Sequence, residues 1–160
     1  MAKADLFEAY AAGFFDGEGS IDIRYSVSKR GYERFYLRVS VIQMDRTPLD
    51  ALMARWGGSV SKRKTGGCHT GAVTTQSAAA FLADVVPLLI VKRKEAEIAL
   101  AFQATMRGGV VNTAGTKGVD RLPDSVRQRR YDLMLAMRDA RWEKGVFARP
   151  RANVPAQRVN

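Results

Sequence analysis

Nine residues, Ala11-Ala12-Gly13-Phe14-Phe15-Asp16-Gly17-Glu18-Gly19, decide how this chain folds. Nearly every residue from Asp5 to Phe15 is apolar, which predicts a helix over Asp5–Asp16 that must be buried on all sides. Gly17 and Gly19 allow that helix to stop, because glycine accepts backbone angles that other residues resist. Glu18 is then expected to project from the first residue of a strand.

A second copy of the chain is expected to cover part of this helix, because a small domain has little room around a helix near its own N-terminus. Ala12 and Asp16, and likewise Gly13 and Gly17, are four residues apart and stack along the helix. We therefore predict a homodimer whose interface includes Ala12, Gly13 and Asp16. Two acidic helix ends side by side are costly. A divalent cation would remove that cost, and carboxylate, carbonyl and water oxygens are the ligands that Mg²⁺ prefers.

Beyond the motif the hydrophobic period changes to two, which predicts a β-hairpin. A strand from Ser20 and a second strand from Arg34 to Val41 flank a turn at Lys29-Arg30-Gly31. One face of this hairpin is apolar, and the other is polar and basic. A solvated sheet surface is the ordinary interpretation of such a face, but several arginines and hydroxyls with few acids suit base edges and phosphates.

The rest of the chain predicts a single α+β domain. Thr47 as a cap and Pro48 at the first position start a helix that ends at Gly57-Gly58. A second hairpin, a helix capped by Ser77 and another helix after Pro87 follow. We expect a core over 1–106, a glycine-rich connector and C-terminal helix of the same domain over 107–144, and a basic disordered tail over 145–160.

Composition points to a polyanionic partner. The chain has 160 residues and a net charge of +10, and a strongly basic protein of this size most often binds nucleic acid. The single cysteine, Cys68, excludes an internal disulfide and suits a reducing compartment. We find neither a signal peptide nor an apolar run that could span a membrane. The expected setting is intracellular, in a bacterial or phage cytoplasm or an organelle, with no membrane and no small-molecule substrate.

Residues 11–19 resemble the signature of the LAGLIDADG homing endonucleases. Ala12, Gly13, Asp16 and Gly19 match that motif, and Glu18 replaces its last acid conservatively. The order of elements is also similar to about residue 106. The resemblance implies an αββαββα core, an antiparallel saddle-shaped sheet that lies over DNA, and extra C-terminal helices. Because the motif occurs once, it implies the homodimeric type, joined through the motif helix.

The resemblance also implies a function. It indicates a site-specific double-strand DNA endonuclease, associated with intron or intein mobility, that cuts a long pseudo-palindromic site by metal-dependent phosphodiester hydrolysis. Glu18 and the Gly17 carbonyl would hold Mg²⁺, with Mn²⁺ or Ca²⁺ able to replace it for binding, and Asp16 would lie beside it. Lys92 falls on the family's active-site lysine. Gln43 falls where related enzymes keep a polar residue near the nucleophilic water.

The residues expected to contact DNA are polar, mostly basic or hydroxyl-bearing side chains of the two hairpins and the following turn. Two related alternatives stay open: an RNA maturase, and a non-cleaving DNA-binding protein of the same fold. An unrelated basic RNA-binding protein is a third. Glu18 and Lys92 favour cleavage, because a binder gains nothing from an acid that faces phosphates. The expected DNA contacts are Arg24, Ser26, Ser28, Lys29, Arg30, Arg34, Tyr36, Arg38, Ser40, Arg46, Ser61, Arg63 and His69.

Overall fold

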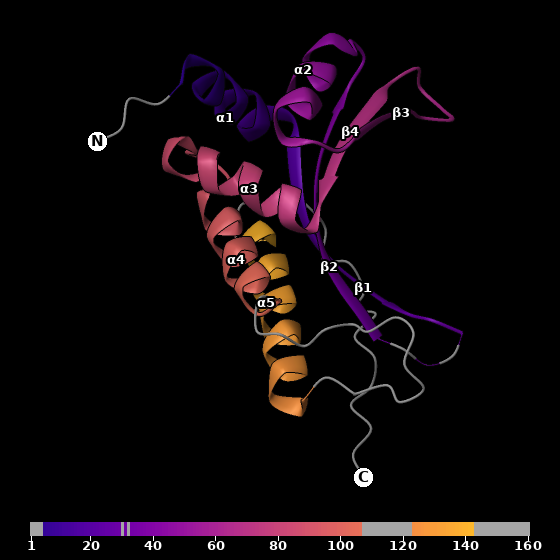
Figure 1. Cartoon of the computed structure of the whole chain (residues 1–160), viewed down its shortest axis with the longest axis vertical. Helices are drawn as coiled ribbons and strands as arrows, with labels where there is room; N and C mark the ends of the chain where they lie inside the picture. Colours follow the sequence, from indigo (N-terminus) through magenta and orange to yellow (C-terminus); the bar gives the residue numbers. More distant parts are fainter. Residues whose placement is uncertain (1–4, 30, 32, 107–122, 143–160) are drawn as a thin grey trace.

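The structure is a computed structural model that describes residues 5–29, 31, 33–106 and 123–142. Arg30, the predicted connector 107–122 and the predicted tail 145–160 lie outside these residues. The described elements follow the predicted order αββαββα, from α1 to α3, and then add a short 3₁₀ turn and two further helices, α4 and α5 (Figure 1). They are α1 (Leu6–Glu18), β1 (Gly19–Val27), β2 (Glu33–Gln43), α2 (Thr47–Trp56), β3 (Ser59–Lys62), β4 (His69–Thr74), α3 (Thr75–Val85), the 3₁₀ turn η1 (Val86–Leu88), α4 (Arg93–Ala104) and α5 (Asp124–Trp142).

The four strands form one antiparallel sheet in the order β1-β2-β4-β3. The helices lie on one side of this sheet, to its left in Figure 1, and we call the opposite side the outer face. Odd-numbered residues of β1 and β2 point toward the helices, and even-numbered residues point to the outer face, because side chains alternate along a strand. The predicted α+β fold with an antiparallel sheet is confirmed.

The core lies between the sheet and the helices. Strand residues such as Ile21 and Leu37, which are 2% and 0% exposed, pack against helical residues such as Phe15, Leu82 and Phe102. Alternate burial along β2 repeats the period of two that its sequence shows. At roughly 25 cal/mol per Å² of buried apolar surface, this layer is the main source of stability. No helix within the described residues is long and apolar enough to cross a membrane.

Two predicted helix starts are wrong. Thr47 does not cap α2; its backbone N–H instead donates to the Asp45 carboxylate at 2.8 Å, so the capping oxygen comes from two residues earlier. Ser77 does not cap α3, which already begins at Thr75. At α2 a local carboxylate, two residues before Thr47, supplies the oxygen that was predicted to come from Thr47, and at α3 the helix begins directly after β4 without an intervening loop.

The first helix is also longer than predicted. It passes through Gly17 and ends at Glu18, with Gly19 as its cap. Gly19 is required there because a Cβ at this position would lie 2.0 Å from the ring of Phe15. Gly17 meets no such constraint, since a Cβ there would have nothing within 4 Å. The close approach to Phe15, rather than helix propensity, selects the residue at which the strand begins.

Helix α5 is attached to the core by polar and aromatic contacts. The Tyr131 hydroxyl donates to Glu33 at 3.1 Å, and its ring packs against Tyr25 and Phe35. Arg130 is 5% exposed and donates to the hydroxyl and the carbonyl of Thr105 at the end of α4, both at 3.1 Å. These contacts hold α5 against α4 and the edge strand β1.

Candidate functional site

The outer face of the sheet is polar and carries arginines. Arg24 is exposed, and Arg34 and Arg38 lie on the neighbouring strand β2. The guanidinium of Arg34 lies 5.9 Å from the centre of the Tyr36 ring, a cation–π contact that orders both side chains. This face therefore presents forked donors and a planar ring on a rigid sheet, which is what recognition of base edges and phosphates requires.

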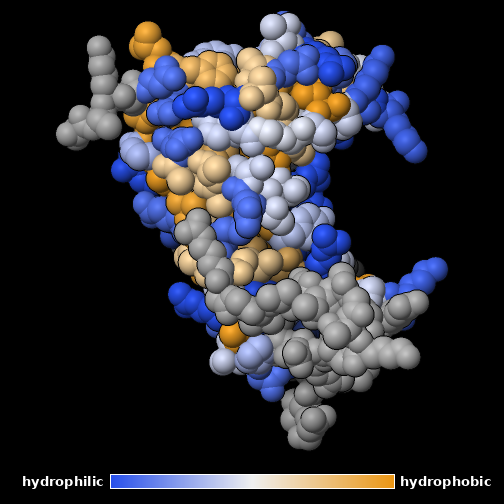
Figure 2. All heavy atoms as spheres, viewed as in Figure 1, coloured by the Kyte–Doolittle hydropathy of each residue, from blue (hydrophilic) through white to orange (hydrophobic). Residues whose placement is uncertain are grey.

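The smaller candidates of the hairpins are placed differently. Ser26, Ser28 and Lys29 are exposed near the end of β1, and Ser61 and Arg63 are exposed near the end of β3. Ser40 is only 8% exposed, and its hydroxyl lies 3.1 Å from that of Ser20. Ser40 therefore lies beneath the exposed side chains of the outer face. Figure 2 shows hydrophilic side chains extending from both hairpin ends at the right of the molecule.

At the end of α1, Gly17 and Glu18 are both exposed at the point where the helix meets the sheet. The last carbonyls of a helix have no partner within it. Here the Gly19 N–H donates to the Phe15 carbonyl, and the Lys92 ammonium donates to the Asp16 carbonyl. The Gly17 carbonyl comes next at this helix end, and the exposed residue Glu18 follows it in the sequence.

Asp16 holds two distant parts of the chain together. One carboxylate oxygen accepts from the N–H groups of Ile90 and Val91 at 2.7 and 3.1 Å, and the other accepts from the N–H of Lys92 at 2.9 Å. Partial burial raises the pKa of Asp16, but these hydrogen bonds and the nearby Lys92 charge outweigh it and leave the pKa below its ordinary value. Asp16 is thus a structural carboxylate that positions Lys92.

Lys92 and Gln43 reach the same end of the sheet from different elements. Lys92 precedes the first turn of α4 and is half-buried against α1. Gln43 is the last residue of β2, and because Gly19 pairs with Val41, Gln43 lies alongside the end of α1. Its side-chain carbonyl accepts from the Met44 N–H at 2.8 Å. The structure therefore places Gln43 and Lys92 at the end of the sheet where α1 ends at Glu18, which sequence separation alone does not show.

The donor set at this edge suits a hard divalent cation only if other molecules complete it. Glu18 supplies a carboxylate and Gly17 a carbonyl, which are ligands of the type Mg²⁺ prefers. No group of three or more His, Cys, Asp or Glu side chains in the described part of the chain could hold a metal by itself. The remaining oxygens would have to come from water, phosphate or a second copy of the chain.

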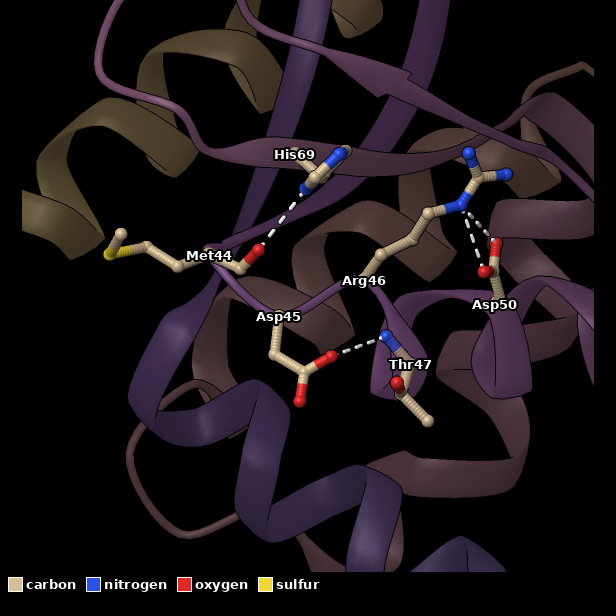
Figure 3. A network of polar contacts seen from close by, with 6 residues as sticks. All are labelled: Met44, Asp45, Arg46, Thr47, Asp50 and His69. Carbon is tan, nitrogen blue, oxygen red and sulfur yellow. Dashed lines mark hydrogen bonds and ion pairs between the residues drawn. The ribbon is translucent and has the colours of Figure 1, made fainter.

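Two predicted DNA contacts are engaged within the protein. The ring of His69 meets the Met44 carbonyl at 3.1 Å, and register with Gln43 places it on the side of the sheet opposite Arg38 (Figure 3). The Arg46 guanidinium donates to both carboxylate oxygens of Asp50, at 3.1 and 2.9 Å. Both residues shape the connection between β2 and α2 in this structure, and the Arg46 hydrogen bonds to Asp50 use only the Nε–H group.

The motif helix is buried on one side only within a single chain. Ala12 is 1% exposed and belongs to the chain's own core, and Asp16 is bound to the start of α4. One chain therefore covers only part of the helix, and the remaining side is the one that we predict a second copy to cover. The open side carries Leu6 and Tyr10, at 88% and 48% exposed, together with Gly13 and Gly17. Figure 2 shows apolar residues at the surface over α1.

Sequence reasoning missed three features of this site. Ile90 and Val91 are 88% and 51% exposed next to the end of α1, and their own loop gives no periodic signal that predicts this. The Asp45 carboxylate accepts a hydrogen bond from the Thr47 backbone N–H, and the backbone and hydroxyl hydrogen bonds from Thr47 lower the pKa of Asp45. Arg141 of α5 reaches Asp22 on the outer face at 2.9 Å.

Comparisons with known proteins were made at the level of family models, curated proteins and solved structures. No family model and no curated protein matches the chain. Solved structures do match. The archaeal intron-encoded homing endonuclease I-Vdi141I, complexed with DNA, superimposes with a TM-score of 0.70 at 18% identity, over 86% of each chain. The likeness at this identity concerns the fold.

Two further solved structures show the same likeness. The homing endonuclease I-CvuI, in complex with the I-CreI target, has a TM-score of 0.59 and 22% identity over 80% of this chain and 94% of its own. The LAGLIDADG homing endonuclease I-GzeII, in complex with its DNA target, has a TM-score of 0.64 and 15% identity over 92% of this chain and 54% of its own. The resemblance that residues 11–19 indicated is confirmed: the chain has the fold of the LAGLIDADG homing endonucleases.

Proposed function

We propose that the chain is a site-specific DNA endonuclease that acts as a homodimer and hydrolyses phosphodiester bonds with a divalent cation. The observation that carries this proposal is that three segments lie at the same end of an arginine-bearing sheet: the end of α1 with Gly17 and Glu18, the end of β2 with Gln43, and Lys92, which contacts the Asp16 carbonyl. Solved structures with this fold hold DNA, which supports duplex DNA as the partner.

Glu18 and the Gly17 carbonyl would hold the cation. A bound divalent cation supplies a water of lowered pKa and stabilises charge on the leaving oxygen. Mg²⁺ is the proposed ion, and one solved structure of this fold was obtained with Mg and another with Ca. Lys92 would place a fixed positive charge beside the scissile phosphate, where it stabilises the developing negative charge. Gln43 would orient a water molecule through its amide.

A homodimer is supported by the open side of α1. This side exposes Leu6 and Tyr10, and Ile90 and Val91 add exposed apolar surface next to the end of the helix, which a second copy would cover. Gly13 and Gly17 lie on the same side and would allow two helices to approach closely, since neither has a neighbour within 4 Å. Pairing through this side would bring two acidic helix ends, and hence two cleavage sites, together.

The length of the recognition hairpin sets the length of the DNA site. Strand β1 has nine residues, which span roughly 30 Å, and duplex DNA rises about 3.4 Å per base pair. One hairpin thus covers about nine base pairs, and a two-fold dimer would read about twice that length as a pseudo-palindrome.

Cleavage of a randomised duplex library with Mg²⁺ tests this function. We expect the unmodified chain to cut a defined site in both strands. Glu18→Gln should abolish cutting and leave binding measurable, because it removes a ligand charge while keeping the shape of the side chain. Lys92→Met should reduce turnover more than affinity. Its matched control is Lys62→Met, which removes the same charge from the exposed end of β3.

The outcomes separate the candidate functions. Full cutting by Glu18→Gln would remove Glu18 from the metal site. A parent chain that binds a defined DNA site without cutting it would favour the non-cleaving alternative. A parent that prefers structured RNA over every duplex in the library would favour the maturase.

A further inference from the structure

An acidic residue lies among the arginines of the outer face. Asp22 of β1 pairs in register with Arg38 of β2, so the two side chains are direct neighbours across the strands. Its two carboxylate oxygens contact different guanidinium groups. Oδ1 accepts from Arg141 at 2.9 Å, and Oδ2 lies 3.6 Å from Arg24. Asp22 is therefore surrounded by three arginines from three elements.

The third arginine comes from a part of the chain that the recognition hairpin does not contain. Arg141 lies near the end of α5, 119 residues from Asp22 in sequence. Because β1 is an edge strand, α5 can pack beside it and send Arg141 to the outer face. This contact links the C-terminal helix to the surface that we propose for reading DNA.

Exposure shows which member of the cluster is accessible to a ligand. The side chain of Arg24 is 48% exposed, whereas that of Asp22 is 22% exposed and that of Arg141 is 29% exposed. The carboxylate thus lies behind the guanidinium of Arg24, with both of its oxygens engaged. A free carboxylate here would repel phosphates, but the three arginines leave this cluster with a net positive charge.

We propose that Asp22 and Arg141 are positioning residues for base recognition by Arg24, an inference that rests on the proposed function. Arg141 fixes the carboxylate of Asp22, and Asp22 fixes one edge of the Arg24 guanidinium. The donors of Arg24 that do not face Asp22 are then held in one orientation for a guanine edge. A long arginine side chain loses less rotamer freedom on binding when it is already held in this way.

This role makes a prediction that net charge alone does not. Asp22→Asn removes a negative charge and should tighten binding to every sequence, whereas Arg141→Gln removes a positive charge and should weaken it. Both substitutions should nevertheless lower discrimination at the base pair that Arg24 contacts. If the residues acted only through charge, affinity would change in opposite directions and base preference would not change.

The test is a binding profile of the full chain on every single-base variant of its selected site, measured without divalent cation. Arg24→Ala first identifies the base pair that Arg24 reads. The parent should discriminate there by about 5- to 150-fold, as a bidentate arginine–guanine pair does. Asp22→Asn and Arg141→Gln should each reduce that ratio by about threefold or more, in the range of direct coupling between neighbours.

Arg138→Gln is the matched control, because Arg138 lies on the same helix and pairs with its neighbour Asp139 at 3.5 Å. It should weaken binding as Arg141→Gln does and keep the parent's preference. Arg141→Lys keeps the positive charge but removes the forked guanidinium donors. It therefore tests positioning if Arg141→Gln proves unstable. We expect Arg141→Lys also to lower discrimination at the base pair that Arg24 contacts.

Two results would overturn the proposal. One is a folded Asp22 or Arg141 variant that keeps the parent's base preference at the Arg24 position. The other is an Arg138→Gln variant that loses this base preference as much as Arg141→Gln does. A parent chain that selects no site from the library would instead refute the proposed function, and with it the basis of this inference.

Discussion

At the scale of single residues, Asp16 shows how one side chain can belong to a motif and act through structure. Its carboxylate accepts three backbone hydrogen bonds from residues 90–92, and its own carbonyl accepts from Lys92. The residue therefore fixes the position of Lys92 relative to the end of α1. A carboxylate held by several N–H groups is stabilised in its charged form, which is the origin of its lowered pKa.

The lowered pKa predicts a pH-dependent stability. Because the pKa of Asp16 in the folded chain lies below its ordinary value of 3.8, its contribution is complete above that value and disappears as the pH falls through the folded pKa. We expect Asp16→Asn to lower the free energy of unfolding at neutral pH by about 1–2 kcal/mol, allowing for partial exposure. The difference from the parent should shrink below the ordinary pKa.

Urea unfolding of parent and variant across this pH range measures the difference. Asp139→Asn, which removes an equal charge from a side chain that is 63% exposed, is the control and should have little effect. A deficit in Asp16→Asn that stayed constant down to the most acidic pH would contradict a role for the ionised carboxylate.

At the scale of elements, α1 has two sides with different tasks. Ala11, Ala12 and Phe15 close the core, and the opposite side exposes Leu6, Tyr10 and two glycines. The core of the single chain requires the apolar residues of the first side, and the proposed dimer would account for those of the second side. One side satisfies the fold of a single chain, and the other is free for a second copy.

Gly13→Leu tests the free side. A side chain at this position meets nothing within 4 Å in the single chain, so folding should be kept and, since leucine favours helix over glycine by about 1 kcal/mol, even slightly favoured. Two helices packed at Gly13 would be forced apart. We therefore expect a folded monomer, or aggregates of it, where the parent is a dimer, measured by sedimentation velocity together with circular dichroism.

Ala101→Leu is the control, because Ala101 is an exposed alanine on α4 and the change adds similar apolar bulk away from α1. This variant should keep the parent's association state. A parent that sediments as a monomer at micromolar concentration would rule out the dimer, and a Gly13→Leu variant that remained dimeric would place the interface elsewhere.

At the scale of the whole molecule, the net charge and the arrangement of the sheet and helices both suit a polyanionic partner. The helices occupy one side of the sheet (Figure 1), and the outer face carries arginines on two adjacent strands. The net charge of +10 adds a general attraction for a polyanion to this local pattern. A duplex laid against the outer face would place phosphates near the hairpins and near the edge where Glu18 and Lys92 meet.

The charge predicts a steep salt dependence of DNA binding. If the chain makes about 6–10 phosphate contacts, affinity should fall by about 10³–10⁵ between 50 and 200 mM salt, because each contact releases condensed counterions. Titrations of one duplex at several salt concentrations give this slope directly. Lys29→Ala should reduce the slope by about one contact and weaken all sequences alike. A flat response would argue against nucleic acid as the partner.

Local sequence determined the order of the elements and indicated which residues to test for a role in cleavage. Period-two alternation in β1 and β2 predicted which residues face the core, and the burial of Ile21, Leu37 and Val39 confirms it. The motif at 11–19 indicated the fold through its resemblance to a family signature, and Gly19 gives one physical reason, since a Cβ there would lie 2.0 Å from the ring of Phe15. These features are readable because each depends on neighbours within a few residues.

Only the tertiary structure decided how distant segments meet. Asp16 binds residues 74 to 76 positions away, and Arg141 binds Asp22 across 119 positions. Which side of α1 stays open depends on where α3 and the sheet cover it, and the apolar sequence on both sides gave no way to choose. Hydrogen bonds and packing between segments far apart in the chain leave no periodic pattern in either segment, so they emerge only when the fold brings the partners together.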